Sequence, residues 1–179
     1  ARARGTKTLA EIAGYASTCD AYHRVQIAPN VAEPVRAIEL ALTDAGISKE
    51  QIGYINLHGT STQLNDKMET MAIRRCFGLH ADRIPCSSTK SMIGHSLGAD
   101  GGIECVASIL ELDRGFVHPS LNCEDLHPKL SAYAASITHE IREMQPGIIA
   151  KASFGFGDVN ACVIFEKWDP RNFNQTRSS

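Results

Sequence analysis

A lysine and a histidine lie five residues apart in a polar loop between two apolar segments. The surrounding stretch, residues 84–113, reads IPCSSTKSMIGHSLGADGGIECVASILELD, with Lys90 and His95 where a short strand is expected to give way to a glycine-rich helix. In α/β proteins, ligands and reactive side chains gather at junctions of this kind. The alternative is a turn that holds a Lys and a His incidentally, because short motifs also match by chance.

A second histidine, His58, ends an apolar strand further upstream. It is followed by Gly-Thr-Ser-Thr, whose hydroxyls can hydrogen-bond a polar ligand and whose Gly59 lets the backbone approach that ligand closely. His95 is expected to be neutral, because the start of a helix and the charge of Lys90 both disfavour an imidazolium. The other histidines lie in loops, at element ends or in polar surroundings, where surface or capping roles are expected: His23, His80, His118, His127 and His139.

Two neutral imidazoles and one ammonium suit a single task well, the stabilisation of negative charge on a carbonyl oxygen. They suit a metal poorly, because Lys90 would repel it and no carboxylate has ligand spacing to the histidines. We therefore expect no metal at this site.

Three acidic residues each have two interpretations. Glu104 lies mid-helix among apolar neighbours, where a carboxylate is costly unless it is paired. It either pairs with Lys90 and fixes its position, or faces solvent. Asp66 and Glu69 share one face of another helix, which is either simply solvated or orients the loop after His58.

Hydrophobic periodicity gives the elements that must position these residues. Strands and helices alternate along the chain and then two strands close it, which predicts an α/β sheet covered by helices. Residues 116–130 are expected to form a long connection and residues 131–147 an irregular segment, with a strand near Ile137. Gly155-Phe156-Gly157 is either a simple hairpin turn or a mobile loop at the site. The expected strands are 8–16, 52–57, 84–86, 148–156 and 160–165, and the helices 34–42, 64–77 and 103–112, with Gly46 as a C-cap.

The composition narrows the function classes. The chain of 179 residues is long enough for one domain, and its net charge of -2 gives no electrostatic case for nucleic acid or an anionic membrane. No apolar run reaches membrane-spanning length. The six cysteines are spaced singly, which indicates free thiols in a reducing, cytoplasmic setting. A strand that starts so near residue 1 suggests that the chain continues a preceding segment.

Three segments, taken together, resemble the C-terminal half of the β-ketoacyl-acyl-carrier-protein synthases in order and spacing. They are HGTST from His58, STKSMIGHSLGA from Ser88 and SFGFGDVN from Ser153. The resemblance covers residues 7–168 and implies a thiolase-like fold, with residues 1–168 as the domain and 169–179 as a polar tail. It points to the elongating condensing enzymes of fatty-acid and polyketide synthesis, and leans toward type II polyketide or polyene pathways.

The resemblance also implies roles for individual residues. His58 and His95 match the two active-site histidines, which hydrogen-bond the malonyl thioester carbonyl and the enolate formed on decarboxylation. Lys90 and Glu104 match the active-site lysine and its acidic partner. The remaining matches concern the substrate arm: Thr60 and Thr62 match threonines that contact pantetheine, and Phe156 matches a gating phenylalanine whose amide forms half of the oxyanion hole.

The family's nucleophilic cysteine has no counterpart in this chain, so another segment or a partner chain must supply it. The resemblance implies substrates carried on the phosphopantetheine of an acyl carrier protein, no resident cofactor, and a dimer of complete units. An exposed apolar face is expected where the missing half would pack. The final loop has Asp158 where the family usually has glycine, which can alter its geometry or polarity.

Two alternatives stay open. One is a non-catalytic, chain-length-factor-like partner subunit, against which the retention of both histidines and Lys90 argues. The other, a thiolase-fold enzyme acting on coenzyme A thioesters, is disfavoured by the STKSMIGH segment.

Overall fold

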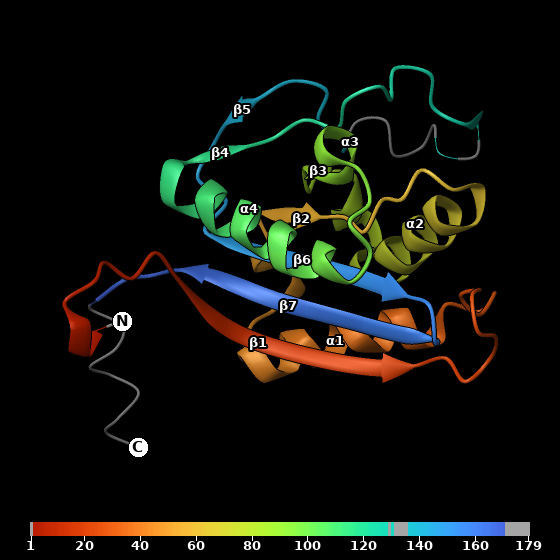
Figure 1. Cartoon of the computed structure of the whole chain (residues 1–179), viewed down its shortest axis with the longest axis horizontal. Helices are drawn as coiled ribbons and strands as arrows, with labels where there is room; N and C mark the ends of the chain where they lie inside the picture. The colour runs from red at the N-terminus through yellow and green to blue at the C-terminus, as the bar shows by residue number, and fades with distance from the viewer. Residues whose placement is uncertain (1, 129, 131–135, 171–179) are drawn as a thin grey trace.

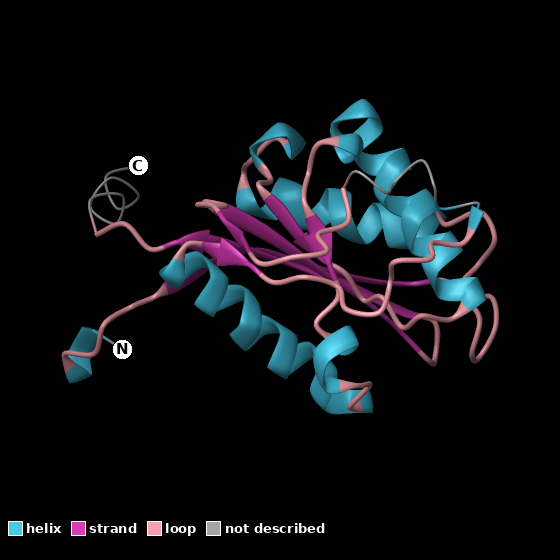
Figure 2. Ribbon diagram, turned by 90° about the horizontal axis from the view of Figure 1, so that it is seen from above, coloured by secondary structure: helices cyan, strands magenta, loops and turns pink. Residues whose placement is uncertain are grey.

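The computed structural model describes residues 2–128, 130 and 136–170. Its centre is a mixed five-stranded sheet in the order β1-β7-β6-β2-β3, with helices on both faces (Figures 1 and 2). β1, β7 and β6 pair antiparallel, whereas β6, β2 and β3 pair parallel. The predicted α/β class is confirmed. The sheet strands are β1 (Ala10–Cys19), β2 (Tyr54–Asn56), β3 (Cys86–Ser87), β6 (Ile148–Gly155) and β7 (Val159–Lys167).

The helices form where the apolar periodicity predicted them, with ends set by local chemistry. α1 (Ala32–Ala45) ends at Gly46, whose φ of 65° is the left-handed conformation that glycine adopts freely. α2 (Gln63–Phe77) begins after Thr62, whose side chain accepts a hydrogen bond from the Asn65 amide. α4 (Asp100–Arg114) is longer at both ends than predicted, and the short α3 (Lys90–Ile93) precedes it.

Two apolar cores lie on opposite faces of the sheet. α1 and α2 cover one face, and α4 covers the other, in front of β6 and β2 in Figure 1. Because strand side chains alternate in direction, β6 sends Ala150 toward α1 and α2 and Ile149 toward α4. α1 packs directly against β1 at Gly14, where an added Cβ would collide with the Ala41 carbonyl oxygen.

The second half of the chain departs from prediction in its connections. The stretch expected to be a long connection opens with a short strand, β4 (Phe116–Val117), which pairs antiparallel with β5 (Arg142–Glu143). A local apolar pattern could not reveal either strand, because each has two residues and depends on its partner. The strand expected near Ile137 is a single bridge to Cys86. Residues 131–135 and the tail from 171 lie outside the described part of the chain.

The sheet order brings three distant segments to one edge. β2 lies between β6 and β3 and runs parallel to both, so the carboxyl ends of all three strands point the same way. The loops after β2 and β3 consequently dock together, and the Ser88 hydroxyl donates to the Gly59 carbonyl oxygen at 2.9 Å. A Cβ at Gly59 would lie 2.5 Å from that of Ser88, so glycine is required there for loop–loop contact.

Candidate active site

His58 lies directly after β2 and is held through its backbone. Its amide donates to Oε1 of Glu69 at 2.7 Å, and the Gly59 amide donates to Oε2 at 2.8 Å. The Glu69 side chain is buried on α2, beneath the loop that it orients. The interpretation of Glu69 as a loop-orienting residue is therefore confirmed, and the solvated-face alternative is wrong for it.

Lys90 determines which nitrogen of His58 carries the proton. Lys90 Nζ lies 3.4 Å from Nδ1 of His58, and an ammonium can only donate, so Nδ1 accepts and the proton is on Nε2. Burial, followed by the charges of Lys90 and Lys151, lowers the pKa of His58 to about 3. His58 is thus a neutral donor through Nε2, as the sequence predicted for an imidazole of this site.

His95 lies in the loop between α3 and α4, next to His58. The ring centroids are 5.9 Å apart at an interplanar angle of 89°, and the His95 side chain is 43% exposed. α4 begins five residues later, after a 3-10 turn at Leu97–Ala99, so His95 is not at the first turn of the helix. Nδ1 of His95 accepts from the Leu97 amide and also contacts the carboxylate of Asp100. That His95 is neutral stays a prediction.

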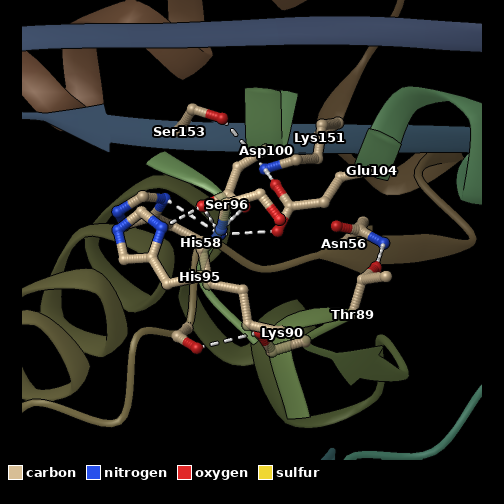
Figure 3. A network of polar contacts seen from close by, with 12 residues as sticks. Asn56, His58, Thr89, Lys90, His95, Ser96, Asp100, Glu104, Lys151 and Ser153 are labelled. Atoms are coloured by element: carbon tan, nitrogen blue, oxygen red, sulfur yellow. Dashed lines mark hydrogen bonds and ion pairs between the residues drawn. The ribbon is translucent and has the colours of Figure 1, made fainter. Parts of the chain in front are cut away.

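Four buried charges stand behind the histidines (Figure 3). Lys90 Nζ lies 2.5 Å from Oε1 of Glu104 and 3.4 Å from Oδ2 of Asp100. Lys151, on β6, lies 2.9 Å from Oε2 of the same Glu104. The predicted pairing of Glu104 with Lys90 is confirmed, since Glu104 is fully buried, and the solvent-facing alternative is wrong.

The sequence did not single out Asp100 or Lys151. Burial alone would raise the pKa of Asp100, but the Ser96 amide, Lys90 and His95 together outweigh burial and lower it. Burial lowers the pKa of Lys151, against the opposing effect of Glu104. For Lys151 a signal existed, because a single lysine in an otherwise apolar strand is as costly to bury unpaired as Glu104 is in its helix. For Asp100 the sequence offers no comparable signal.

A cavity of about 570 Å³ opens in front of the two imidazoles. The Thr60 and Thr62 hydroxyls lie 3.1 Å apart on its wall, and Thr62 also caps α2. Phe156, in the turn between β6 and β7, lines the cavity with its side chain 79% exposed. The structure therefore brings all the predicted substrate-binding residues to the cavity that holds both histidines.

Asp158 adopts the left-handed conformation that the family's glycine would favour, with a φ of 63°. Its carboxylate accepts from the amides of Tyr22 and His23, and its carbonyl oxygen accepts from the Asp20 amide at 2.9 Å. The loop after β1 is thus tied to the turn that carries Phe156. The contact is specific to the Asp158 side chain, and a difference in geometry or polarity from the family's turn stays a prediction.

His118 does not have the surface role expected of it. It is buried, and Nδ1 faces the Ser87 hydroxyl at 3.0 Å while Nε2 faces the Thr89 hydroxyl at 2.9 Å. Burial lowers the pKa of His118. The His118 ring joins β3 to the start of the Lys90 loop, which is a structural role. Only the packing of residues 116–118 under that loop could reveal this role.

The six cysteines, all of which lie in the described part of the chain, are free thiols. Burial raises the pKa of Cys76, Cys86 and Cys162 to about 12, so these thiols are poor nucleophiles. Among the residues that the structure describes, no cysteine lines the cavity, and no cluster of three or more His, Cys, Asp or Glu could hold a metal ion. Within the same ranges, no helix is long and apolar enough to cross a membrane.

Two imidazoles, a fixed ammonium and a cavity at the edge of a mixed sheet define a site for polarising a carbonyl oxygen, on the thiolase-like fold of the ketosynthases. A family model described as the β-ketoacyl synthase C-terminal domain matches residues 9–124. The chain belongs to this family.

Relatives and solved structures agree with the assignment. The chain is 43% identical over 168 residues to a 3-oxoacyl-[acyl-carrier-protein] synthase 2 of Synechocystis sp., covering 94% of this chain and 40% of the relative. A type II polyketide synthase acyl-carrier protein in complex with its ketosynthase bound to a hexaketide matches with a TM-score of 0.85, 34% identity and coverage of 93% and 40%. The ishigamide ketosynthase/chain length factor matches with a TM-score of 0.86, 33% identity and coverage of 94% and 40%. The chain thus spans well under half of these proteins.

Proposed function

We propose that this chain forms the carbonyl-polarising half of a β-ketoacyl-acyl-carrier-protein synthase. A malonyl thioester enters the cavity, and its carbonyl oxygen accepts hydrogen bonds from His58 and His95. Breaking the bond to the carboxylate releases CO₂ and leaves its electron pair as an enolate, whose oxygen the two imidazoles stabilise. The enolate carbon then attacks an acyl group held on a cysteine thioester, forms the new carbon–carbon bond and expels the thiolate.

The observation that carries this proposal is the contact of Lys90 with Nδ1 of His58, from which the tautomer of His58 follows. Lys90, fixed by Glu104, occupies Nδ1 and leaves Nε2–H free to donate to a substrate oxygen. The His95 ring stands 5.9 Å away and lines the same cavity, so one oxygen between the rings can receive both donors. A pair of fixed donors is what a developing enolate oxygen requires, because it needs no reorganisation as charge accumulates.

The substrate arm is expected to lie along the other residues of the cavity. The Thr60 and Thr62 hydroxyls face one another on the wall and offer contacts to a phosphopantetheine arm. Phe156 projects beside them from an exposed turn, as a gate requires, and its backbone amide is the proposed oxyanion donor for the acyl thioester. No cofactor besides the carrier-borne arm takes part in the proposed reaction.

The nucleophilic cysteine is proposed to come from the part of the enzyme that this chain does not span. α4 presents a row of partly exposed apolar side chains, Ile103, Val106 and Leu110, at helical spacing. These side chains lie on the helix that also carries Glu104, so a second half packed on them would face the site. An acyl carrier protein as partner, a dimer of complete units and a cytoplasmic location complete the proposal.

The test is malonyl-thioester decarboxylation by the complete enzyme, followed as CO₂ release. His95→Ala should reduce the rate by about 10²–10³, the usual effect of losing one oxyanion donor. His139→Ala is the matched control, because His139 is exposed, lies outside the cavity lining and should leave the rate unchanged. Near-wild-type decarboxylation by the His95→Ala variant would exclude the proposed role.

The alternative, that this chain is a chain-length-factor-like subunit, is tested by a different experiment. Incubation of the native assembly with an acyl-carrier substrate, followed by intact-mass analysis, shows which chain becomes acylated. The catalytic proposal requires the acylated cysteine and the histidines of this chain to share one cavity. If mutation of His58 and His95 left condensation intact, the structural-partner alternative would stand.

A further inference from the structure

Lys151 is a buried lysine in the middle of an apolar strand. It lies on β6 with its side chain 2% exposed, on the face that β6 turns toward α4. Its ammonium group lies 2.9 Å from Oε2 of Glu104, donates to the Ser153 hydroxyl at 3.0 Å, and also contacts the carbonyl oxygen of Ala152. The ammonium thus has two hydrogen-bond acceptors, in Ser153 and Ala152, and one ion-pair partner, Glu104, so its buried charge is compensated.

Glu104 consequently has a cation at each of its two oxygens. Lys90 occupies Oε1 and Lys151 occupies Oε2, from α3 and from β6 respectively (Figure 3). A carboxylate held at one oxygen only can rotate, whereas one held at both cannot. Because Lys151 contacts Oε2, Oε1 is left to Lys90. The contact between Lys90 and Oε1 sets where Lys90 Nζ lies relative to His58.

We propose that Lys151 is a positioning residue of this site, which holds Glu104 so that Lys90 faces Nδ1 of His58 and keeps the proton on Nε2. Lys151 acts through Glu104 and Lys90 and does not itself touch the reacting atoms. The role of this arrangement in catalysis rests on the proposed function. The arrangement itself is a property of the folded site and can be measured without substrate.

The charged groups around the His58 ring determine how its protonation responds to the removal of Lys151. The groups that act on the His58 ring are Lys90 from α3, Lys151 from β6, His95 from the loop after α3 and Asp100 from α4, while Glu69 of α2 holds its backbone. Glu104 of α4 contacts both lysines, and the charges of these two lysines, Asp100 and Glu104 sum to zero, with Glu69 as a further carboxylate near Lys151. Loss of Lys151 leaves one excess negative charge, which draws Lys90 toward the two carboxylates and favours a proton at Nδ1 of His58.

The experiment measures the ring nitrogens of His58 by ¹⁵N NMR in the complete enzyme at pH 7, with labelled histidine and His58→Asn for assignment. The wild type should show the pure Nε2–H form. Lys151→Met should lose this pure signal, to a mixture of tautomers or to imidazolium, and should decarboxylate malonyl thioester about 10- to 100-fold more slowly, the usual cost of a misplaced catalytic group.

Two further variants separate positioning from general damage. The double variant Lys151→Met/Glu104→Gln removes one charge of each sign, and its glutamine has a single oxygen that Lys90 can take without Lys151 at a second one, so it should recover the Nε2–H form. Ser153→Ala removes the other side-chain partner of Lys151 and should leave the His58 signal unchanged. If Lys151→Met alone does not fold, the charge-balanced double variant should still fold and show the Nε2–H form.

Three results would overturn the proposal. The first is a folded Lys151→Met variant with the pure Nε2–H signal, and the second is a double variant as perturbed as the single one. The third is a double variant that does not fold. A wild-type enzyme that shows the Nε2–H form but does not decarboxylate malonyl thioester would contradict the proposed function and leave the positioning role supported.

Discussion

Replacement of Glu69 by glutamine should loosen the loop that carries His58. The carboxylate of Glu69 accepts the His58 amide at 2.7 Å, the Gly59 amide at 2.8 Å and Nδ2 of Asn65 at 3.2 Å. A hydrogen bond to a charged acceptor contributes about 1.5–3 kcal/mol. Glutamine keeps one oxygen for one of the two loop amides but turns an NH₂ group toward the other, so one bond to the loop is lost and the other is weakened.

The cost of burying the charged Glu69 offsets part of the free energy that its hydrogen bonds contribute. Burial raises the pKa of Glu69, and the amides of Gly59 and His58 and the charge of Lys151 only partly oppose it. We therefore expect Glu69→Gln to lower the free energy of local loop opening by about 2–3 kcal/mol, which is toward the lower end of what two affected bonds would give. Since each 1.4 kcal/mol is a factor of ten, local opening of the loop should become about 30- to 150-fold more frequent.

Amide hydrogen exchange of the complete enzyme tests this expectation directly. Peptides that contain the His58 and Gly59 amides should exchange faster in Glu69→Gln by the same factor, because these amides exchange through local opening. Lys67→Gln is the matched control on α2, because it removes a charge from an exposed position of the same helix. Unchanged exchange at these two amides in Glu69→Gln, or an equal increase in Lys67→Gln, would refute the reasoning.

Three further predictions concern the same loops. Gly59→Ala should separate the loops, because its Cβ would lie 2.5 Å from that of Ser88, and the loss of decarboxylation should exceed that of Ser88→Ala, which only removes one hydrogen bond. The pKa of His58 is lowered to about 3 from 6.5, so the unfolded state binds more protons between these values. Stability should therefore fall as pH drops below 6.5, by about 1.4 kcal/mol per unit more than in His58→Asn, as urea unfolding at several pH values would show; parallel curves for the two proteins would contradict the lowered pKa. Asp158→Gly should free the loop at Tyr22, so that limited proteolysis cuts there faster while the decarboxylation rate changes little; unchanged cleavage would mean that the carboxylate does not hold the loop.

The elements and the local motifs of this protein were predictable from the sequence. α1 and α2 formed within three residues of prediction, because apolar spacing and capping residues are local properties. Lys90 and His95 were recognisable because both stand in one short junction. The pairing of Glu104 with Lys90 was predicted as one of two alternatives, from the cost of an unpaired carboxylate among apolar neighbours.

The tertiary structure decided how these motifs act together. Only the packing of α4 on β6 places Lys151 beside Glu104, and only the pairing of β2 with β3 sets the loop of His58 against that of Lys90. Asp100 was missed because the effect of a charge depends on its distance from other charges and on its burial, which the chain order does not contain. For Lys151 the lone lysine in an apolar strand was a signal that went unused, but its partner could come only from the fold. The sequence by itself determined which groups could polarise a carbonyl. The fold determined their neighbours, and through them the proton position on His58.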